Sequence, residues 1–150
     1  DSAGAGEFNG GPGGRVVIRA REGSTAVAGF GDGKVFPPQG VLGGESGAGN
    51  RGYIVDNNGE RLEELPMVGI FEIPPGRALE ALIAGGGGFG DPLDRDPERV
   101  RQDVRKGWVT MAKARDTYGV ILDPASEWYT VDYEGTNTLR SRIRRKLRPE

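Results

Sequence analysis

Residues 84–100 read AGGGGFGDPLDRDPERV, and this stretch marks a change in the character of the chain. Of the 27 glycines, 24 lie in residues 1–90 and only three lie beyond them. Short apolar runs between glycine turns are typical of antiparallel strands, whereas apolar residues every three to four positions are typical of helices. We therefore predict an α+β fold, with a glycine-rich antiparallel β unit over residues 1–90 and a helical C-terminal segment over residues 91–150, which together form one non-autonomous domain.

The β unit is predicted from five short runs of β-branched or alternating apolar residues. Asn and Gly accept a positive φ at low cost, so DNNG at 56–59 predicts a hairpin turn, and PPG at 74–76 predicts another tight turn. The glycine-rich stretch 37–52 is too long for a hairpin, and a loop of this kind is functional, covered by a partner or disordered. The predicted strands span residues 15–20, 25–30, 52–56, 69–73 and 79–84.

The first helix is predicted to begin after Asp96, because a short acidic side chain at the N-cap accepts hydrogen bonds from the free backbone N–H groups. Val100, Val104 and Trp108 recur at i, i+4 and i+8, which predicts one apolar stripe. Gly107 supplies the stop signal at the C-terminal end.

Two further helices are predicted beyond the first. Thr110 is expected to cap a short one that ends at Gly119, and a longer one is expected over residues 134–147. The basic residues within 140–148 alternate with apolar ones, which favours an amphipathic docking helix over a nucleic-acid contact. The predicted apolar faces are Met111, Ala114 and Tyr118 in the short helix and Leu139, Ile143 and Leu147 in the long one.

The glycine run at 85–90 allows two interpretations. Backbone N–H groups of a glycine loop can cradle a phosphate, which would make the chain an independent nucleotide-binding module. A phosphate loop requires Lys and then Ser or Thr after its last glycine, whereas Asp91 and Pro92 stand there. We therefore favour a close-packed turn in which only glycine fits.

The chain has no cysteine and no histidine, so it lacks a thiolate nucleophile and the commonest general base and zinc ligand near neutral pH. For this reason no catalytic residue and no metal ligand is assigned. Asp91, Asp94 and Asp96 offer carboxylates to a cation, but they lack the spacing of a calcium loop. We favour helix capping and pairing with Arg95 and Arg99 for these acids.

Charge and hydropathy exclude two classes of partner at the level of sequence. The net charge is −2, with 7 Lys/Arg against 11 Asp/Glu in residues 1–90 and 13 against 11 beyond, so no general nucleic-acid footprint is indicated. No apolar run approaches the roughly 18 residues of a membrane span, and no signal peptide is visible, so we expect a cytoplasmic protein. The chain begins with Asp1 and not Met, as expected of a split gene product, a processed chain or a fragment.

Several blocks of the sequence, in order along the chain, carry a family resemblance. The specific one is GGGGFGDP at 85–92, followed by Arg-Asp-Pro at 95–97 and Tyr-Gly-Val at 118–120. Together the blocks resemble the C-terminal portion of the hydantoinase B/oxoprolinase family. They are DSAGAGEFNGGPG at 1–13, PPQGVLGGESGAGNRGYIV at 37–55, the run from IPPG to GWVT at 73–110, AKARDTYGVIL at 112–122 and VDYEGTNTLRSRIR at 131–144.

The sequence departs from the family pattern at a few positions. Ala3 stands where the family has a further glycine, and Asn9 stands where it often has Arg. Arg77 replaces a usual acidic residue, and Ile83 and Ala84 replace a usual Thr-Pro pair. The implied fold is unaffected by these changes.

The resemblance implies a small subunit that works with two larger partners, a hydantoinase B-like large subunit and a hydantoinase A-like ATPase subunit. In complexes of this type ATP and Mg²⁺ serve to phosphorylate a carbonyl or amide oxygen. Both are expected in the partner subunits, and this chain alone is expected to bind no cofactor and to be inactive.

The reaction implied first is carboxylation of a ketone such as acetophenone by an ATP-dependent multi-subunit carboxylase, whose hydantoinase B-like carboxylase subunit this chain completes. The alternatives are cyclic amide hydrolysis in a hydantoinase or oxoprolinase complex and a purely structural assembly role. The implied partner-site or substrate-facing loop consists of Gly85, Gly86, Gly87, Gly88, Phe89, Gly90 and Asp91.

Overall fold

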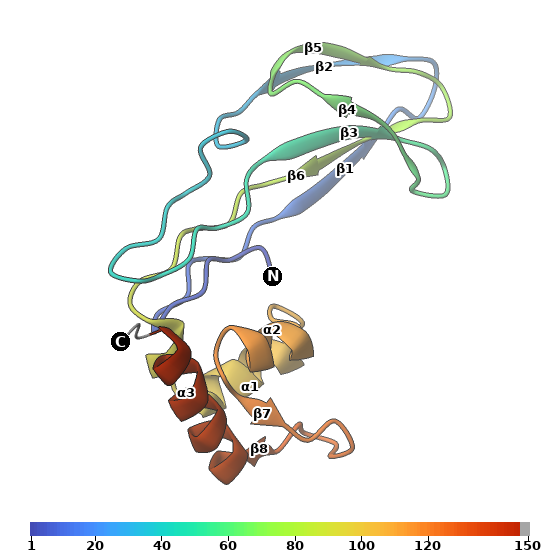
Figure 1. The fold of residues 1–150 in the computed structure, drawn as a ribbon. Coiled ribbons are helices and arrows are strands. Elements are labelled where there is room, and N and C mark those ends of the chain that lie inside the picture. The colour runs from blue at the N-terminus through green and yellow to red at the C-terminus, as the bar shows by residue number, and fades with distance from the viewer. Residues whose placement is uncertain (148–150) are drawn as a thin grey trace.

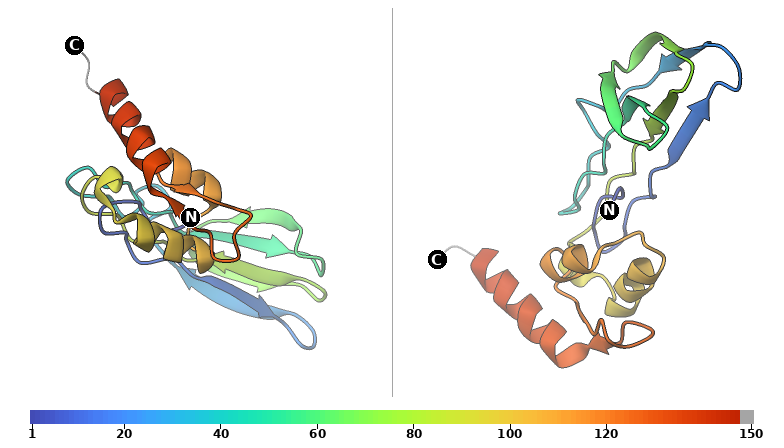
Figure 2. Two further views of the ribbon diagram at one scale, coloured as in Figure 1. Left: turned by 90° about the horizontal axis from the view of Figure 1, so that it is seen from below. Right: turned by 90° about the vertical axis from the view of Figure 1, so that its right-hand side faces the viewer.

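The computed structural model describes residues 1–147, which form a β end and a helical end joined by extended segments (Figure 1). The same division is visible from two further directions (Figure 2). The strands are β1 (Arg15–Arg19), β2 (Thr25–Phe30), β3 (Arg51–Val55), β4 (Arg61–Leu65), β5 (Val68–Ile73), β6 (Ala78–Leu82), β7 (Ile121–Leu122) and β8 (Val131–Asp132). The helices are a 3₁₀ turn η1 (Pro92–Asp94), α1 (Pro97–Arg105), α2 (Met111–Asp116) and α3 (Tyr133–Leu147). This is the predicted α+β fold.

The β end consists of two antiparallel sheets. One has four strands in the order β1-β6-β3-β4, and the other is the pair β2-β5. Every second residue of β2 is less exposed than its neighbours, as expected of a strand with one buried face. The core between the sheets contains Ile54, Leu65, Ile73 and Leu79, with Val27 and Phe71 packed against it.

All five predicted strands are present within two residues of their expected ends, but β4 and the two-residue strands β7 and β8 were missed. The sequence of β4, RLEEL, carries three charges in five residues, because β4 is an edge strand with four of its five residues exposed. The hairpin turn that leads into β4 was predicted. The carboxylate of Asp56 accepts hydrogen bonds from the N–H groups of Asn58 and Glu60, both at 2.8 Å, and Gly59 has a φ of +86°.

The helical end has its own core, in which the predicted faces of the first two helices meet, whereas Leu139 and Ile143 of the long helix are half-buried and lie outside it. Val100, Ala114, Tyr118 and Val120 are buried there together with Ala5 from the N-terminal residues. The inclusion of Ala5 means that this core is completed by a segment from the opposite end of the chain.

Trp108 does not join the apolar stripe, so that prediction was wrong. Helix α1 ends at Arg105, and Gly107 has a φ of +71°, which turns the chain before the tryptophan is reached. Trp108 is therefore exposed, and the ammonium group of Lys106 lies 4.5 Å from the centre of its ring.

Helix α3 docks on its own chain through its basic side chains. The Arg140 guanidinium donates to the carbonyl oxygens of Tyr118 at 3.0 Å and Arg95 at 2.6 Å. Arg144 donates to the carbonyl oxygen of Leu93 at 3.2 Å. The predicted docking role is thus met within the chain. The side chain of Leu147 and residue Arg148, both part of the sequence prediction, lie outside the described residues.

Within residues 1–147, none of the helices is long and apolar enough to cross a membrane.

A buried carboxylate ties three strands of the large sheet together. Glu80 on β6 accepts hydrogen bonds from Arg15 on β1 at 2.6 Å and from Arg61 on β4 at 2.8 Å. The Arg61 guanidinium also lies 4.2 Å from the centre of the Tyr53 ring on β3. Hydrogen bonds from the two arginines lower the pKa of Glu80, so its charged form is stabilised by folding.

Replacement of Glu80 by Gln should lower the free energy of unfolding by about 1–2 kcal/mol at pH 7, because two charge-assisted hydrogen bonds are lost while the arginine ends stay hydrated. Since the pKa is lowered in the folded state, this contribution is present above the ordinary carboxyl pKa and is lost as the pH falls below about 4. Urea unfolding at several pH values would measure the difference. Glu64→Gln, at an exposed pair with Lys34, is the control and should have little effect. An E80Q difference that persists in acid would contradict this account.

Candidate functional site

The glycine run forms the centre of a glycine junction, defined here as residues 1–14, 37–50 and 84–90. Its backbone is extended, and successive N–H groups donate to different neighbouring segments and not to one partner strand. Gly85 donates to Ala48 at 3.0 Å, and Gly86 donates to Gly11 at 2.9 Å. Figure 1 shows the extended segments side by side between the two ends of the molecule.

The backbones of the glycine junction approach too closely for side chains. A Cβ atom on Gly85, Gly87 or Gly88 would lie under 3.0 Å from a backbone oxygen, a separation that real Cβ atoms essentially never show. The same holds in the facing segments for Gly4, Gly10, Gly13, Gly40, Gly44 and Gly47. The prediction that only glycine fits is therefore confirmed at Gly85, Gly87 and Gly88. The predicted turn is wrong, because the run is extended and only Gly90 has a positive φ, of +76°.

The hydrogen bonds of the run leave little for an anion. Gly85, Gly86, Gly88 and Gly90 each donate their N–H group to a carbonyl oxygen of the chain. A phosphate cradle needs several convergent N–H groups that are free to bind it. The arrangement therefore argues against an independent phosphate loop.

The seven residues of the predicted loop differ in their accessibility. Gly85, Gly88 and Gly90 are buried, Gly86 and Gly87 are half-buried, and Phe89 and Asp91 are exposed. The carboxylate of Asp91 accepts a hydrogen bond from the N–H group of Leu93 at 2.8 Å and caps η1. Phe89 is the other exposed residue of this run, and its side chain makes no hydrogen bond.

Phe89 belongs to an exposed apolar cluster that we call the Phe89 patch, made of Phe8, Val41 and Phe89. The rings of Phe8 and Phe89 are 6.4 Å apart, and the backbone of Phe89 pairs with both Phe8 and Val41. All three side chains are about half exposed in this chain. An apolar cluster on an ordered part of the surface is typical of a binding site.

A polar cluster joins the glycine junction to the helical end. The sequence analysis did not find it. Arg95 donates to the Asp103 carboxylate at 2.9 Å and to the Glu7 carbonyl oxygen at 2.9 Å. Asn9 donates to the same carboxylate at 3.0 Å, and the Tyr118 hydroxyl donates to Asn9 at 2.8 Å. The cluster therefore ties the N-terminal residues to α1 and to the residues that follow α2. The available signal was Asn9 itself, one of the positions at which the sequence departs from the resembled pattern.

The chemistry of this cluster favours a fixed structure over proton transfer. Burial raises the pKa of Tyr118 to about 12, so its hydroxyl remains a hydrogen-bond donor at neutral pH. Asp103 is buried, and its charge is compensated by the buried guanidinium of Arg95. A small cavity of about 160 Å³ beside the cluster is lined by Arg95, Asp103 and Trp108, among others.

The three acids after the glycines act as caps and pairs. Asp91 caps η1, and the carboxylate of Asp96 accepts a hydrogen bond from Glu98 at 2.9 Å and caps α1. Asp94 pairs with Arg144, and Arg95 pairs with Asp103. Capping is thus confirmed, whereas the predicted ion-pair partners were wrong. Among residues 1–147 no cluster of three or more acidic side chains is arranged to hold a metal ion.

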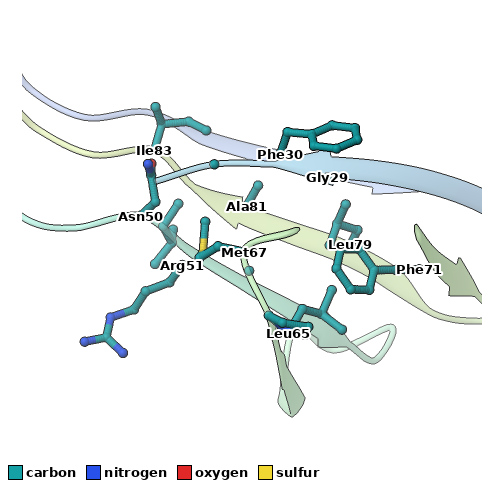
Figure 3. A pocket seen from close by; sticks show the side chains of 14 residues that line it. Gly29, Phe30, Asn50, Arg51, Leu65, Met67, Phe71, Leu79, Ala81 and Ile83 are labelled. Carbon is teal, nitrogen blue, oxygen red and sulfur yellow. The ribbon is translucent and has the colours of Figure 1, made fainter. Parts of the chain in front are cut away.

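An apolar pocket lies between the two sheets (Figure 3), with a volume of about 290 Å³. The Asn50 amide accepts a hydrogen bond from Ala84 at 2.7 Å and donates to the carbonyl oxygen of Asp32. Arg51 turns away from the pocket in Figure 3 and donates to Glu64 at 3.3 Å. The polar side chains of Asn50 and Arg51 are thus hydrogen-bonded to groups outside the pocket. The apolar walls come from Leu65, Met67, Phe71, Leu79 and Ala81, among others.

Comparison with known proteins identifies similar chains. Residues 1–92 match the family described as Hydantoinase B/oxoprolinase. The chain is 35% identical to caprolactamase subunit beta of Pseudomonas jessenii over 82% of its own length and 22% of that protein. It is 42% identical to the acetone carboxylase alpha subunit of Xanthobacter autotrophicus over 42% of its own length and 8% of that subunit.

A solved structure with the same fold extends the likeness to both ends of the chain. The ATP-dependent caprolactamase from Pseudomonas jessenii superimposes with a TM-score of 0.71 and 29% identity, over 94% of this chain and 24% of that one. The chain therefore spans less than a quarter of the length of these relatives.

Replacement of Gly88 by Ala should lower the free energy of unfolding by about 3 kcal/mol or more, because the new Cβ would overlap with the carbonyl oxygen of Ala5. Gly11→Ala is the control, since nothing lies within 4 Å of a Cβ there. Thermal unfolding followed by circular dichroism would measure both variants. Equal melting temperatures for the two would show that the junction is not close-packed.

Replacement of Asp103 by Ala should lower the free energy of unfolding by about 3–5 kcal/mol, because the buried Arg95 charge would lose its partner. Asp116→Ala, which breaks an exposed pair with Arg115, should cost less than about 1 kcal/mol. Urea unfolding of both variants is the measurement. A loss for D103A as small as that for D116A would rule out a structural role for the cluster.

Proposed function

Because this chain belongs to the hydantoinase B/oxoprolinase family, we propose that it forms part of an ATP-dependent enzyme complex that hydrolyses a cyclic amide. The observation that carries the proposal is the caprolactamase likeness, which extends over 82% of the chain in sequence and 94% in structure. Relatives of this type are subunits of ATP-dependent carboxylases or amide-hydrolysing enzymes, so a role within an enzyme complex is the part common to them all. We place this complex in the cytoplasm, where ATP is supplied.

Ketone carboxylation, with acetophenone as one substrate, is the second candidate. The sequence analysis placed it first, and the 42% identity to an acetone carboxylase subunit supports it. That alignment covers 42% of the chain, about half the extent of the caprolactamase alignment. An acetone carboxylase structure matches the chain as well as the caprolactamase does, over 97% of its length with a TM-score of 0.70. We therefore rank amide hydrolysis ahead of carboxylation on the extent of the sequence alignments alone.

Both reactions activate the substrate in the same way. Transfer of a phosphoryl group to a carbonyl or amide oxygen turns that oxygen into a better leaving group or traps an enol, which lowers the barrier of the following step. Resolved pKa shifts in this chain keep acids ionised and Tyr118 protonated at neutral pH, so they favour binding and positioning over proton transfer. We propose that this chain shapes the site and that its partners supply acid–base groups.

We propose that the glycine run and the acids after it hold neither a nucleotide nor its magnesium ion. The N–H groups of Gly85, Gly86, Gly88 and Gly90 are engaged with carbonyl oxygens, and the carboxylates of Asp91 and Asp96 cap helices. This supports placing ATP and Mg²⁺ in the partner subunits, a hydantoinase A-like ATPase and a hydantoinase B-like large subunit.

The surface of the chain supports a permanent partner. Its accessible area is 9352 Å², whereas a compact monomer of 16.0 kDa exposes about 7,400 Å². Among the described residues, seventeen large hydrophobic side chains are exposed, against fourteen buried ones when alanines are left out. The Phe89 patch is our candidate for the part of this surface that faces a partner's active site.

The purified complex should hydrolyse ATP in the presence of a lactam or hydantoin and release the ring-opened product. With a ketone and bicarbonate it should turn over more slowly by at least about tenfold, because binding energy is specific to the reacting geometry. Product analysis by mass spectrometry with coupled ADP detection would measure both. Faster turnover of the ketone would reverse our ranking, and turnover by the isolated chain would refute the dependence on partners.

A substitution at the Phe89 patch separates a site role from a scaffolding role. Gly87 is unsuitable for this purpose, because a side chain there would overlap with the Gln39 backbone and disturb the fold. Phe89→Ala removes an exposed side chain and leaves the backbone bonds in place. Reduced turnover with the complex intact would support a site-facing patch, whereas loss of the complex would favour scaffolding.

A further inference from the structure

The open edge of the large sheet at β1 is unusual. β1 forms the border of the four-stranded sheet (Figure 1), and its sequence is RVVIR. All five residues are exposed, including Val16, Val17 and Ile18 in succession. Side chains alternate between the two faces of a strand, so β1 lacks cover on both faces as well as along its edge.

The opposite edge of the same sheet is protected in the ways that natural edges usually are. β4 carries Arg61, Glu63 and Glu64, and its pairing with β3 is interrupted by a register shift at Ile54 and Val55. Charges and bulges prevent an edge strand from pairing with other chains. β1 pairs with β6 in regular register over all five residues and has neither a bulge nor a charge at its centre. The edge at β4 is thus protected against further strand pairing, whereas the edge at β1 can accept another strand.

The exposed area of the chain is sufficient for such a continuation. The excess over a compact monomer is about 2,000 Å², more than the roughly 800 Å² that each partner buries in a standard interface. The relatives are more than four times as long as the matched segment, so most of a hydantoinase B-type polypeptide is available to supply the missing cover.

We infer that β1 pairs with a strand from the rest of a hydantoinase B-type polypeptide, so that the four-stranded sheet continues beyond β1. This inference rests on the proposed function for the identity of the partner. The centre of β1 is apolar and Arg15 and Arg19 stand at its ends. Opposite charges directly across two strands are stabilising, so the partner strand should be apolar at its centre and acidic at its ends.

A second copy of this chain fits the edge less well. If two β1 strands paired antiparallel about Val17, Arg15 of each would stand opposite Arg19 of the other. Like charges directly opposite one another destabilise a strand pair. The same charges attract an acidic partner, so the edge favours a different strand over its own copy.

The test compares Val16→Lys with Leu62→Lys. Val16 is 47% exposed on β1 and Leu62 is 50% exposed on β4, so the two substitutions should affect the isolated chain alike. Each is introduced into the complete assembly that contains this chain, purified through an affinity tag and analysed for its components by mass spectrometry. Hydrogen–deuterium exchange is then measured at residues 15–19 and 61–65.

In the unaltered assembly, exchange at residues 15–19 should be slower than in the isolated chain by at least about tenfold, because outward-facing N–H groups gain partners. Val16→Lys should abolish this protection or release the large polypeptide, since an edge lysine opposes pairing. Leu62→Lys should leave both unchanged. Fast exchange at β1 in the assembly, or equal effects of the two variants, would overturn the inference.

The remaining outcomes separate the inference from the proposed function. If the assembly turns over a lactam or a ketone while β1 exchanges rapidly, the inference fails and the function stands. An assembly without a hydantoinase B-type polypeptide refutes both. Protection of β1 in a dimer of this chain alone identifies a second copy as the occupant and also overturns the inference.

Discussion

Close backbone contact in the glycine junction is the constraint on which the rest of the structure depends. Three stretches of chain, within residues 1–14, 37–50 and 84–90, pass so near one another that many positions have no space for a Cβ atom. Their N–H and carbonyl groups satisfy each other across the segments. This region therefore obtains its order from backbone hydrogen bonds and close contact and not from buried side chains.

The glycine junction explains how two small cores act as one unit. The β end has its core between two sheets, and the helical end has its core around Val100 and Tyr118. Each alone is small for an independent fold. Ala5 enters the helical core, and the cluster of Arg95, Asp103 and Asn9 binds the N-terminal residues to α1. The Phe89 patch on the glycine junction is thereby held in place by the β end on one side and the helical end on the other.

Much of the fold was accessible to sequence reasoning, whereas the site was only partly so. Runs of β-branched residues and helix caps report local preferences, and these predicted five strands and the caps at Asp96 and Thr110. β4 was missed because an exposed edge strand has a polar sequence. Trp108 was misplaced because the helical period continues in the sequence after Gly107 has ended the helix. Position 9 was noticed as a departure from the family pattern, but its partner Asp103 is 94 residues away, and spacing carries no signal for such a pair.

The sequence by itself determined the class of fold, the place where strands give way to helices and the preference for glycine at 85–88, because these follow from local backbone preference and side-chain size. Only the tertiary structure decided that the run is an extended segment with most of its N–H groups already bonded. It also decided that Phe89 faces solvent. It decided as well that β1 is an unprotected edge of the sheet, whereas the edge at β4 is protected by charges. These facts depend on which distant segments lie next to each other, and contact at close range between distant segments is a property of the folded chain that no local pattern contains.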